Sequence, residues 1–146
     1  MNPRATFDMT QHQEIIEIKT RGQGLVKITE SVNSVVSRSK VTSGTCLVFV
    51  QHTSASLVIQ ENADPTVQED LQHWMSELAP SQRHWRHDDE GPDDMPAHAK
   101  SAITKTGEVI PVSSCRLALG TWQGLYLWEH RSAPHLRRLV VHVQGE

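Results

Sequence analysis

The chain has 146 residues, of which 37% are hydrophobic and 21% are charged, and its formal net charge is -3 with histidine neutral. This composition is typical of one soluble globular domain, and the length is enough to bury a core without cross-links. The lack of a basic excess gives no reason to expect nucleic acid or an anionic lipid surface as a partner. No apolar run approaches the ~18 residues of a membrane span.

Cysteine usage and the first residues bear on the compartment. Only two cysteines occur, Cys46 and Cys115, and neither their number nor their spacing suggests a disulfide framework or a zinc ribbon. The opening MNPRATFDMTQ lacks the apolar stretch of a signal peptide. We therefore expect a cytoplasmic protein with no membrane partner.

The first half of the chain predicts strands around one short helix. Residues 1–10 predict a loose N-terminal segment, and partial alternation at 12–20 predicts a strand. Valines on one helical face predict a helix from about Thr29 to Ser39. CLVFVQH at 46–52 is apolar on both faces, which predicts a central strand covered on both sides. SLVIQE at 56–61 predicts a further strand.

Residues 62–80 carry the strongest helix signal. Asp64 suits the N-cap, and Pro65 suits the first helical position, where its missing N–H costs nothing. The helix should pack on the sheet through an apolar stripe made of Val67, Leu71, Trp74, Met75 and Leu78.

The remaining segments predict a long loop, a short helix and four strands. Polar residues with proline and glycine at 81–95 predict a long loop. Loops of this length in small domains are often functional. Pro96 can open a short helix through about Ile103. The four strands are EVIPVS, RLALGTW, LYLWEH and LRRLVVHV. This order predicts an α+β fold with a mostly antiparallel sheet, two main helices and a short third, in a single domain at 11–146.

Three histidines stand at the ends of predicted elements: His52, His98 and His130. Imidazoles from three separate elements are what an open zinc-type site requires, with water in the fourth position. Nearby acids such as Asp93 and Asp94 could orient these rings or bind magnesium directly. His87 is the reserve ligand. The alternative is that these residues are structural. His52 could be a core histidine hydrogen-bonded to a backbone carbonyl, and Asp94 could simply stabilise the start of the helix opened by Pro96.

The same segments also suit an anion. Thr53 and Ser54 place hydroxyls beside His52, while Lys100 and Arg131 lie close in sequence to candidate histidines. An arginine fork, an ammonium and hydroxyl donors together match phosphate. Alternatively, the two cations simply pair with neighbouring acids.

Four segments resemble one known family: QHTSASLVIQENADPTVQEDL, EGPDDMPAHAK, RLALGTWQGLYLWEHR and VQGE. In this order they are similar to the small YjbQ-like proteins, also labelled secondary thiamine-phosphate synthases, from about residue 11 to the end. One departure is SSCRLALG, where the family usually has a glycine before the arginine and this chain has Cys115. If that glycine takes a positive φ in the family, either Cys115 is strained or the turn differs here.

The resemblance implies a homotrimer whose pocket is lined by the matching motifs. It implies an enzyme that joins a pyrimidine diphosphate to a thiazole phosphate, as a main or side activity, with a zinc or magnesium ion. Carried onto this sequence, the metal ligands are His52, His98 and His130. The catalytic residues are Asp93, Asp94, Lys100 and Arg131, and the substrate-binding residues are Thr53, Ser54, Glu61 and Asn62. The alternative is a non-catalytic trimeric module that binds a phosphorylated metabolite.

Overall fold

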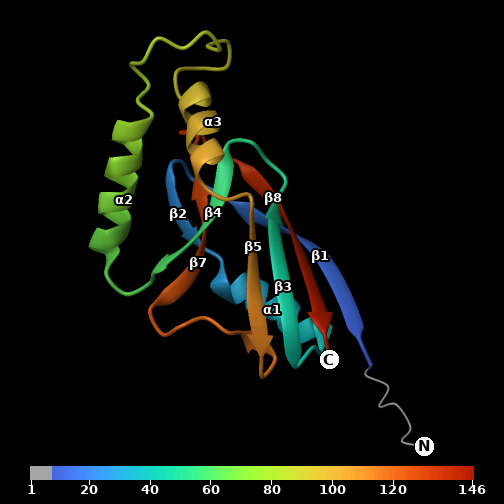
Figure 1. The fold of residues 1–146 in the computed structure, drawn as a ribbon. Coiled ribbons are helices and arrows are strands. Elements are labelled where there is room, and N and C mark those ends of the chain that lie inside the picture. Colours follow the sequence, from blue (N-terminus) through green and yellow to red (C-terminus); the bar gives the residue numbers. More distant parts are fainter. Residues whose placement is uncertain (1–7) are drawn as a thin grey trace, which may run out of the picture.

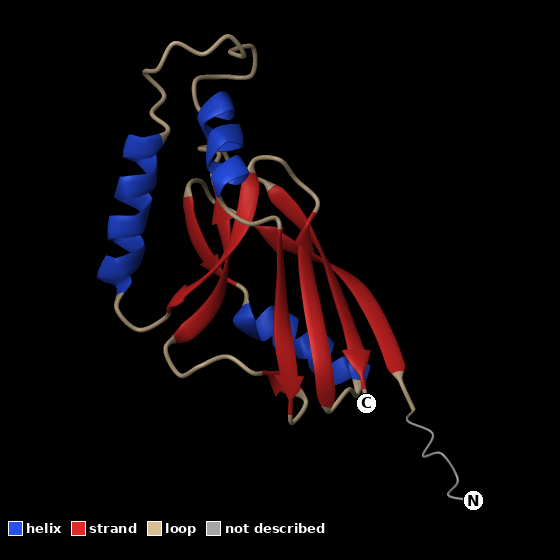
Figure 2. Ribbon diagram, viewed as in Figure 1, coloured by secondary structure: helices blue, strands red, loops and turns tan. Residues whose placement is uncertain are grey.

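The structure is a computed structural model that describes residues 8–146 (Figures 1 and 2). The predicted loose segment at 1–10 falls mostly outside these residues, and Thr10 already begins the first strand. The elements in chain order are β1 (Thr10–Lys19), β2 (Gly24–Lys27), α1 (Thr29–Ser39), β3 (Ser43–Val50), β4 (Ala55–Glu61), α2 (Pro65–Leu78), α3 (Asp94–Ile103), β5 (Gly107–Ser113), β6 (Arg116–Leu117), β7 (Gln123–Glu129) and β8 (Leu136–Gly145).

The strands form two sheets in which neighbouring strands run antiparallel. The larger sheet has the order β1-β8-β3-β5-β6, and the smaller one has the order β2-β7-β4. The α+β class and the antiparallel pairing are confirmed. The prediction of one sheet is corrected, because β7 pairs with β2 and β4 and not with the strands that flank it in sequence.

The core lies where α1 meets the larger sheet and the inner face of the smaller one. Val32, Val35 and Val36 of α1 are fully buried, as their helical spacing predicts. They join a cluster that includes Val48 of β3 and Leu127 of β7. Burying each such side chain contributes roughly 1.5–3 kcal/mol, so this cluster holds both sheets to one helix.

The strand β3 is central, as predicted, but it is covered on one face only. It lies between β8 and β5, and Cys46, Val48 and Val50 are buried. Leu47 and Phe49, which point to the other face, are 39% and 44% exposed. The helix α3 borders this face at the pocket beside Phe49, yet both side chains stay exposed, so the prediction of double cover is wrong for a single chain.

The helix α2 starts as predicted and packs less than predicted. The Asp64 carboxylate accepts the backbone N–H of Thr66 at 3.0 Å, and a proline follows it in the first turn. Of the predicted stripe, Met75 is buried, whereas Trp74 and Leu78 are 52% and 50% exposed. Figure 1 shows the reason: α2 runs beside the smaller sheet and does not lie across it.

A two-residue turn joins β5 to β6, with Ser113 paired to Arg116. Its central residues Ser114 and Cys115 both have positive φ, at 53° and 64°. Positive φ at both positions is the type I′ hairpin geometry, which favours glycine at the second of them. The first of the two expectations for Cys115 is met, because its backbone takes a left-handed conformation that disfavours any residue with a Cβ.

Replacing Cys115 with glycine should stabilise the fold. The left-handed conformation costs a residue with a Cβ roughly 1–2 kcal/mol, and the greater freedom of glycine in the unfolded chain removes part of that gain. We expect Cys115→Gly to raise the free energy of unfolding by about 0.5–1 kcal/mol, measured by urea titration. Cys115→Ala is the matched control and should give no such gain. If Cys115→Gly and Cys115→Ala had the same free energy of unfolding, the turn would not be strained by a side chain at this position.

Candidate metal centre

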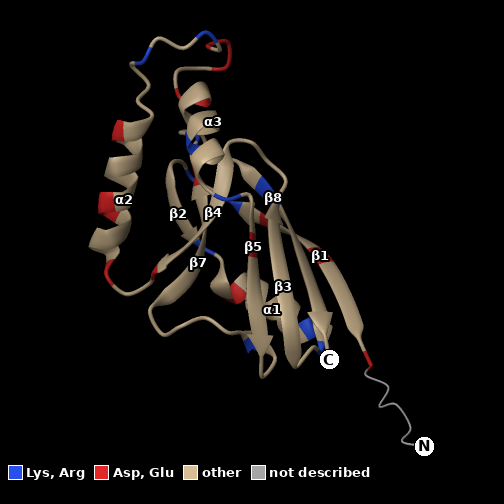
Figure 3. Cartoon of the chain, in the orientation of Figure 1, with Lys and Arg blue, Asp and Glu red and all other residues tan. Residues whose placement is uncertain are grey.

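The candidate site is built around the start of α3. A loop at 79–93 joins α2 to this helix and carries charges of both signs (Figure 3). Asp93 precedes the helix, and Asp94 is its first residue. Asp94 is only 1% exposed. A carboxylate this deeply buried needs partners, because burial without them would disfavour its charge.

Arg131 pairs with both acids. Its Nε donates to Asp93 Oδ2 at 2.9 Å, and its Nη1 donates to Asp94 Oδ1 at 2.7 Å. Its Nη2 donates to the backbone oxygen of Glu90 at 3.0 Å. The guanidinium fork is therefore occupied, and the prediction that it faces a substrate phosphate is not what the geometry shows.

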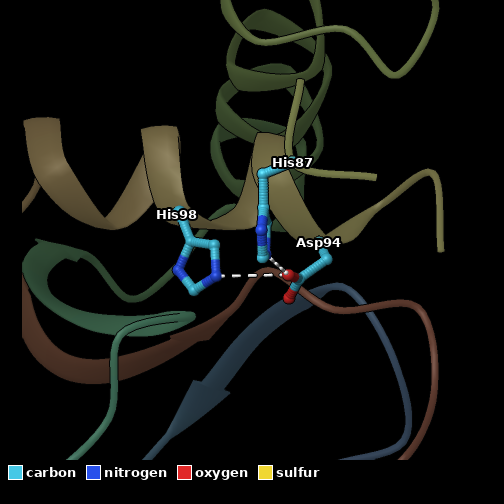
Figure 4. Close-up of side chains that lie close together, drawn as sticks. All are labelled: His87, Asp94 and His98. Atoms are coloured by element: carbon cyan, nitrogen blue, oxygen red, sulfur yellow. Dashed lines mark hydrogen bonds and ion pairs between the residues drawn. The ribbon is translucent and has the colours of Figure 1, made fainter. Parts of the chain in front are cut away.

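Two histidines meet the remaining oxygen of Asp94 (Figure 4). The Nε2 atom of His87 lies 2.8 Å from Asp94 Oδ2, and the Nε2 atom of His98 lies 3.2 Å from the same oxygen. Asp94 and His98 are four residues apart on one helix, a spacing that puts side chains on the same face. Within residues 8–146, these three alone form a group of potential ligand atoms that all lie within 4.8 Å of one another.

The pKa of Asp94 reflects these neighbours. Burial by itself would raise the pKa of this carboxyl. The hydrogen bond from His87 and the charges of His98 and Arg131 outweigh that effect, so the pKa is lowered. Asp94 is accordingly an anion in the folded protein, as a metal ligand has to be.

One ring nitrogen of His98 is held by the backbone. The Nδ1 atom lies 3.0 Å from the backbone oxygen of Thr53, an acceptor only, so Nδ1 carries the proton in the neutral ring. Nε2 then has a lone pair. That nitrogen lies 3.2 Å from Asp94 Oδ2 and is available to bind a metal ion.

The predicted ligand set of His52, His98 and His130 is not the one that the fold brings together. His130 is 1% exposed, and its Nε2 lies 2.8 Å from Ser56 Oγ. The Nε2 atom of His52 accepts the backbone N–H of Arg138 at 2.8 Å. A serine hydroxyl and a backbone N–H thus engage one nitrogen of each ring, while the loop supplies the reserve ligand His87.

A pocket of about 580 Å³ adjoins this cluster. His52, Thr53 and His98 line it, so two of the three predicted histidines share one cavity. Ser101 also lines it, and the buried Oγ of this serine has no hydrogen-bond partner among residues 8–146. Hydroxyl and imidazole groups therefore face a space large enough for a small metabolite. A groove of about 510 Å³ between α2 and β4 contains no residue of the cluster.

The other predicted substrate-binding residues serve the scaffold. Ser54 Oγ accepts from Arg137 Nη2 at 3.0 Å. Glu61 Oε2 accepts two backbone N–H groups before α2, and the Asn62 amide donates to two backbone oxygens. These contacts leave Thr53 as the one member of that predicted set that faces the pocket.

Lys100 faces away from the cluster. Two residues of α-helix correspond to a rotation of about 200°, so Lys100 and His98 lie on nearly opposite sides of α3. His98 lines the pocket described above, and Lys100 lines a different one with Pro96 and Asp93. The prediction that the segment 90–100 delivers both side chains to a single pocket is therefore wrong.

A buried ion pair between Glu129 and Arg137 lies behind the site and was not predicted. Glu129 is fully buried and accepts from Thr20 Oγ1 at 2.6 Å and from Arg137 Nε at 2.8 Å. Its Oε2 also accepts the backbone N–H of Arg131 at 3.2 Å. The signal for Arg137 was available, since alternation in LRRLVVHV places this arginine on the inward face with Leu139.

The fold and the cluster together define a small α+β protein with one candidate metal centre. The family model described as "UPF0047 protein YjbQ-like" matches residues 14–146. The chain is 55% identical over 143 residues to a UPF0047 protein of Synechocystis sp., covering 97% of this chain and 96% of that protein. It is 38% identical to UPF0047 protein YjbQ of Escherichia coli O157:H7, covering 92% and 99%.

Solved structures agree with the sequence relatives. A YbjQ-like protein from Sulfolobus solfataricus P2 superposes with a TM-score of 0.87 at 29% identity, over 95% of this chain and 100% of that one. A protein of the yjbq/upf0047 family from Clostridium acetobutylicum gives 0.82 at 32% identity, over 89% and 98%. The chain belongs to the YjbQ/UPF0047 family. None of the helices described for residues 8–146 has the length and apolarity needed to cross a membrane.

His130 should make the fold less stable in acid. Burial, followed by the nearby charge of Lys100, lowers the pKa of this ring to about 3. Below its usual pKa of 6.5, only the unfolded chain takes up the proton, so stability falls as the pH drops from about 6.5 toward 3. At pH 5 this difference corresponds to about 2 kcal/mol.

In urea titrations, the free energy of unfolding of the unmodified chain should fall between pH 7.5 and pH 5. The fall for His130→Gln should be smaller by about 2 kcal/mol, because glutamine takes up no proton. His73→Gln, a change at an exposed histidine, is the control and should follow the unmodified chain. Identical pH dependence of all three proteins would exclude a neutral, buried His130.

Proposed function

We propose that this protein is an enzyme that uses a divalent metal ion, held by His87, Asp94 and His98, to act on a phosphorylated small molecule. The observation that carries the proposal is the contact of two imidazole nitrogens with one buried carboxylate oxygen, at 2.8 and 3.2 Å. The first reaction to test is the one that the family resemblance implies, the joining of a pyrimidine diphosphate to a thiazole phosphate.

The three side chains fit zinc better than magnesium. Two ligands of one tetrahedral zinc lie about 3.3 Å apart, which is close to the observed separations. Nitrogen ligands suit zinc, whereas magnesium prefers an all-oxygen shell. With three protein ligands, the fourth position of the ion stays open for water or substrate. When bound there, the metal would neutralise negative charge on a departing diphosphate.

The surrounding residues orient these ligands and provide the substrate pocket. The backbone oxygen of Thr53 fixes the tautomer of His98, so its Nε2 faces Asp94. Arg131 holds the other Asp94 oxygen at 2.7 Å and keeps the carboxylate in place. Ser101 lines the adjoining pocket, and its buried hydroxyl, which has no partner among residues 8–146, would have to rotate toward that space to meet a phosphate or a substrate hydroxyl.

Metal binding should depend on the cluster. Protein purified without a histidine tag should bind zinc tightly in a competition titration with a chelating dye. His98→Ala should weaken that affinity by roughly 100-fold or more, because one of three ligands is lost. His73→Ala is the matched control, since His73 forms an exposed pair with Glu77 at 3.0 Å in the same i, i+4 arrangement. Undiminished zinc affinity in His98→Ala would refute the site.

The same titration with Asp94→Asn separates ligation from helix capping. Asn keeps the size of the side chain and loses its charge, so zinc affinity and turnover of the thiamine-phosphate reaction should both fall. Asp93, not Asp94, holds the N-cap position. A fully active Asp94→Asn protein would count against catalysis at this cluster. Substrate binding without turnover in the unmodified chain would favour the non-catalytic binding module.

We further propose that the chain assembles as a homotrimer, as the family resemblance implies. Exposed apolar side chains on the outer face of the larger sheet support association: Ile15, Leu47, Phe49 and Val109. Phe49 also lines the pocket beside His98. Sedimentation should give a trimeric mass at micromolar concentration, and Val109→Glu should shift it toward the monomer. A monomeric unmodified chain would contradict this assembly.

A further inference from the structure

The face of α3 opposite the metal centre borders a second polar pocket. Its volume is about 320 Å³, and it lies between α3, the last turn of α2 and the loop that follows α2. Polar residues reach it from four segments of the chain: Gln23, then Ser76 with Ser81 and Gln82, then Asp93 with Lys100, and Ser132. Alanine and proline side chains supply apolar wall at Ala79, Pro80, Pro92 and Pro96.

Lys100 is the unusual member of this pocket. It is 3% exposed. Among residues 8–146, no hydrogen-bond acceptor for its ammonium is present and no carboxylate lies within 4.0 Å of its Nζ. The other cations near the site are paired: Arg131 with Asp93 and Asp94, and Arg137 with Glu129. The carboxylate of Asp93 lines the same pocket but is already held by Arg131.

A side chain buried this deeply disfavours its charged form, and the nearby charge of Asp93 offsets only part of that effect, so the pKa of Lys100 is lowered. The energetic penalty is removed if an anion occupies the pocket. The hydroxyl of Ser132 accepts from Gln23 Nε2 at 3.3 Å, so its own hydrogen is free to donate into the pocket. An ammonium and a hydroxyl from separate segments suit a group with several acceptor oxygens.

We propose that this pocket binds the phosphate group of a small molecule, with Lys100 as its counter-charge. The site is separate from the metal centre, because the rotation of α3 sends Lys100 and His98 to different cavities. The inference does not rest on the proposed metal or on the proposed reaction. The apolar wall suits a phosphate ester with a small organic part as well as free phosphate.

The test is a calorimetric titration of the full chain with inorganic phosphate and with glycerol phosphate, in the presence of EDTA. We expect millimolar or tighter binding that Lys100→Met weakens at least about tenfold, as the loss of a charge-assisted hydrogen bond requires. Lys27→Met removes an exposed lysine outside this pocket and is the matched control. Tighter binding of glycerol phosphate than of phosphate would identify an ester as the ligand. Equal binding would show that the pocket recognises only the phosphate group.

A second variant blocks the pocket and leaves its charge unchanged. Ser76→Leu extends a side chain from α2 into the same space and should weaken phosphate binding as well, with thermal melting used to verify that each variant is folded. His98→Ala should bind phosphate as the unmodified chain does. The proposal is overturned if the unmodified chain binds no phosphate in EDTA, if both pocket variants bind it normally, or if His98→Ala no longer binds it.

Discussion

The pairing of Arg131 with Asp93 and Asp94 is the contact on which the candidate site depends. It ties the segment after β7 to the start of α3, which lies 37 or 38 residues earlier in the chain. Removing one partner of a buried pair typically costs roughly 3–5 kcal/mol, because the other charge is left uncompensated. Here it would also release Asp94, whose second oxygen meets both histidines. Arg131 is therefore an organising residue and not a free phosphate ligand.

Helix periodicity explains why one short segment serves two cavities. Asp94 and His98 are four residues apart and share a face, whereas Lys100 follows His98 by two residues and turns to the other side. The acid pair, the imidazole and the ammonium of 90–100 are close in sequence but do not form one constellation. Their roles divide between the cluster with His87 and the pocket that Lys100 lines.

Local signals in the sequence were sufficient for most of the fold. The bounds of α1, the capped start of α2 and the order of the long strands follow from periodicity and from Asp64–Pro65. The four-residue strand β2 follows a glycine-rich turn and was not predicted, since it is too short for alternation to be visible. The division into two sheets depends on long-range pairing of β7 with β2 and β4, which no local pattern encodes.

The site was harder to predict because ligand choice is decided by three-dimensional direction. His52 and His130 stand at strand ends, where a functional side chain is reasonable, yet backbone and serine contacts engage one nitrogen of each ring. His87 lies in the 79–93 loop, and the local sequence RHDDEG supported it only as a reserve ligand. Only the path of that loop back toward Asp94 makes it part of the cluster (Figure 4).

Charge gives a reason why this cluster suits a cation. One guanidinium, that of Arg131, faces the two carboxylates of Asp93 and Asp94, so it neutralises them only in part. The remaining negative charge lies next to two imidazole rings, and a divalent ion bound at Asp94 Oδ2 would offset it. Asp93, Asp94 and Arg131 already hold one another, so binding of an ion to that oxygen would not require these contacts to rearrange.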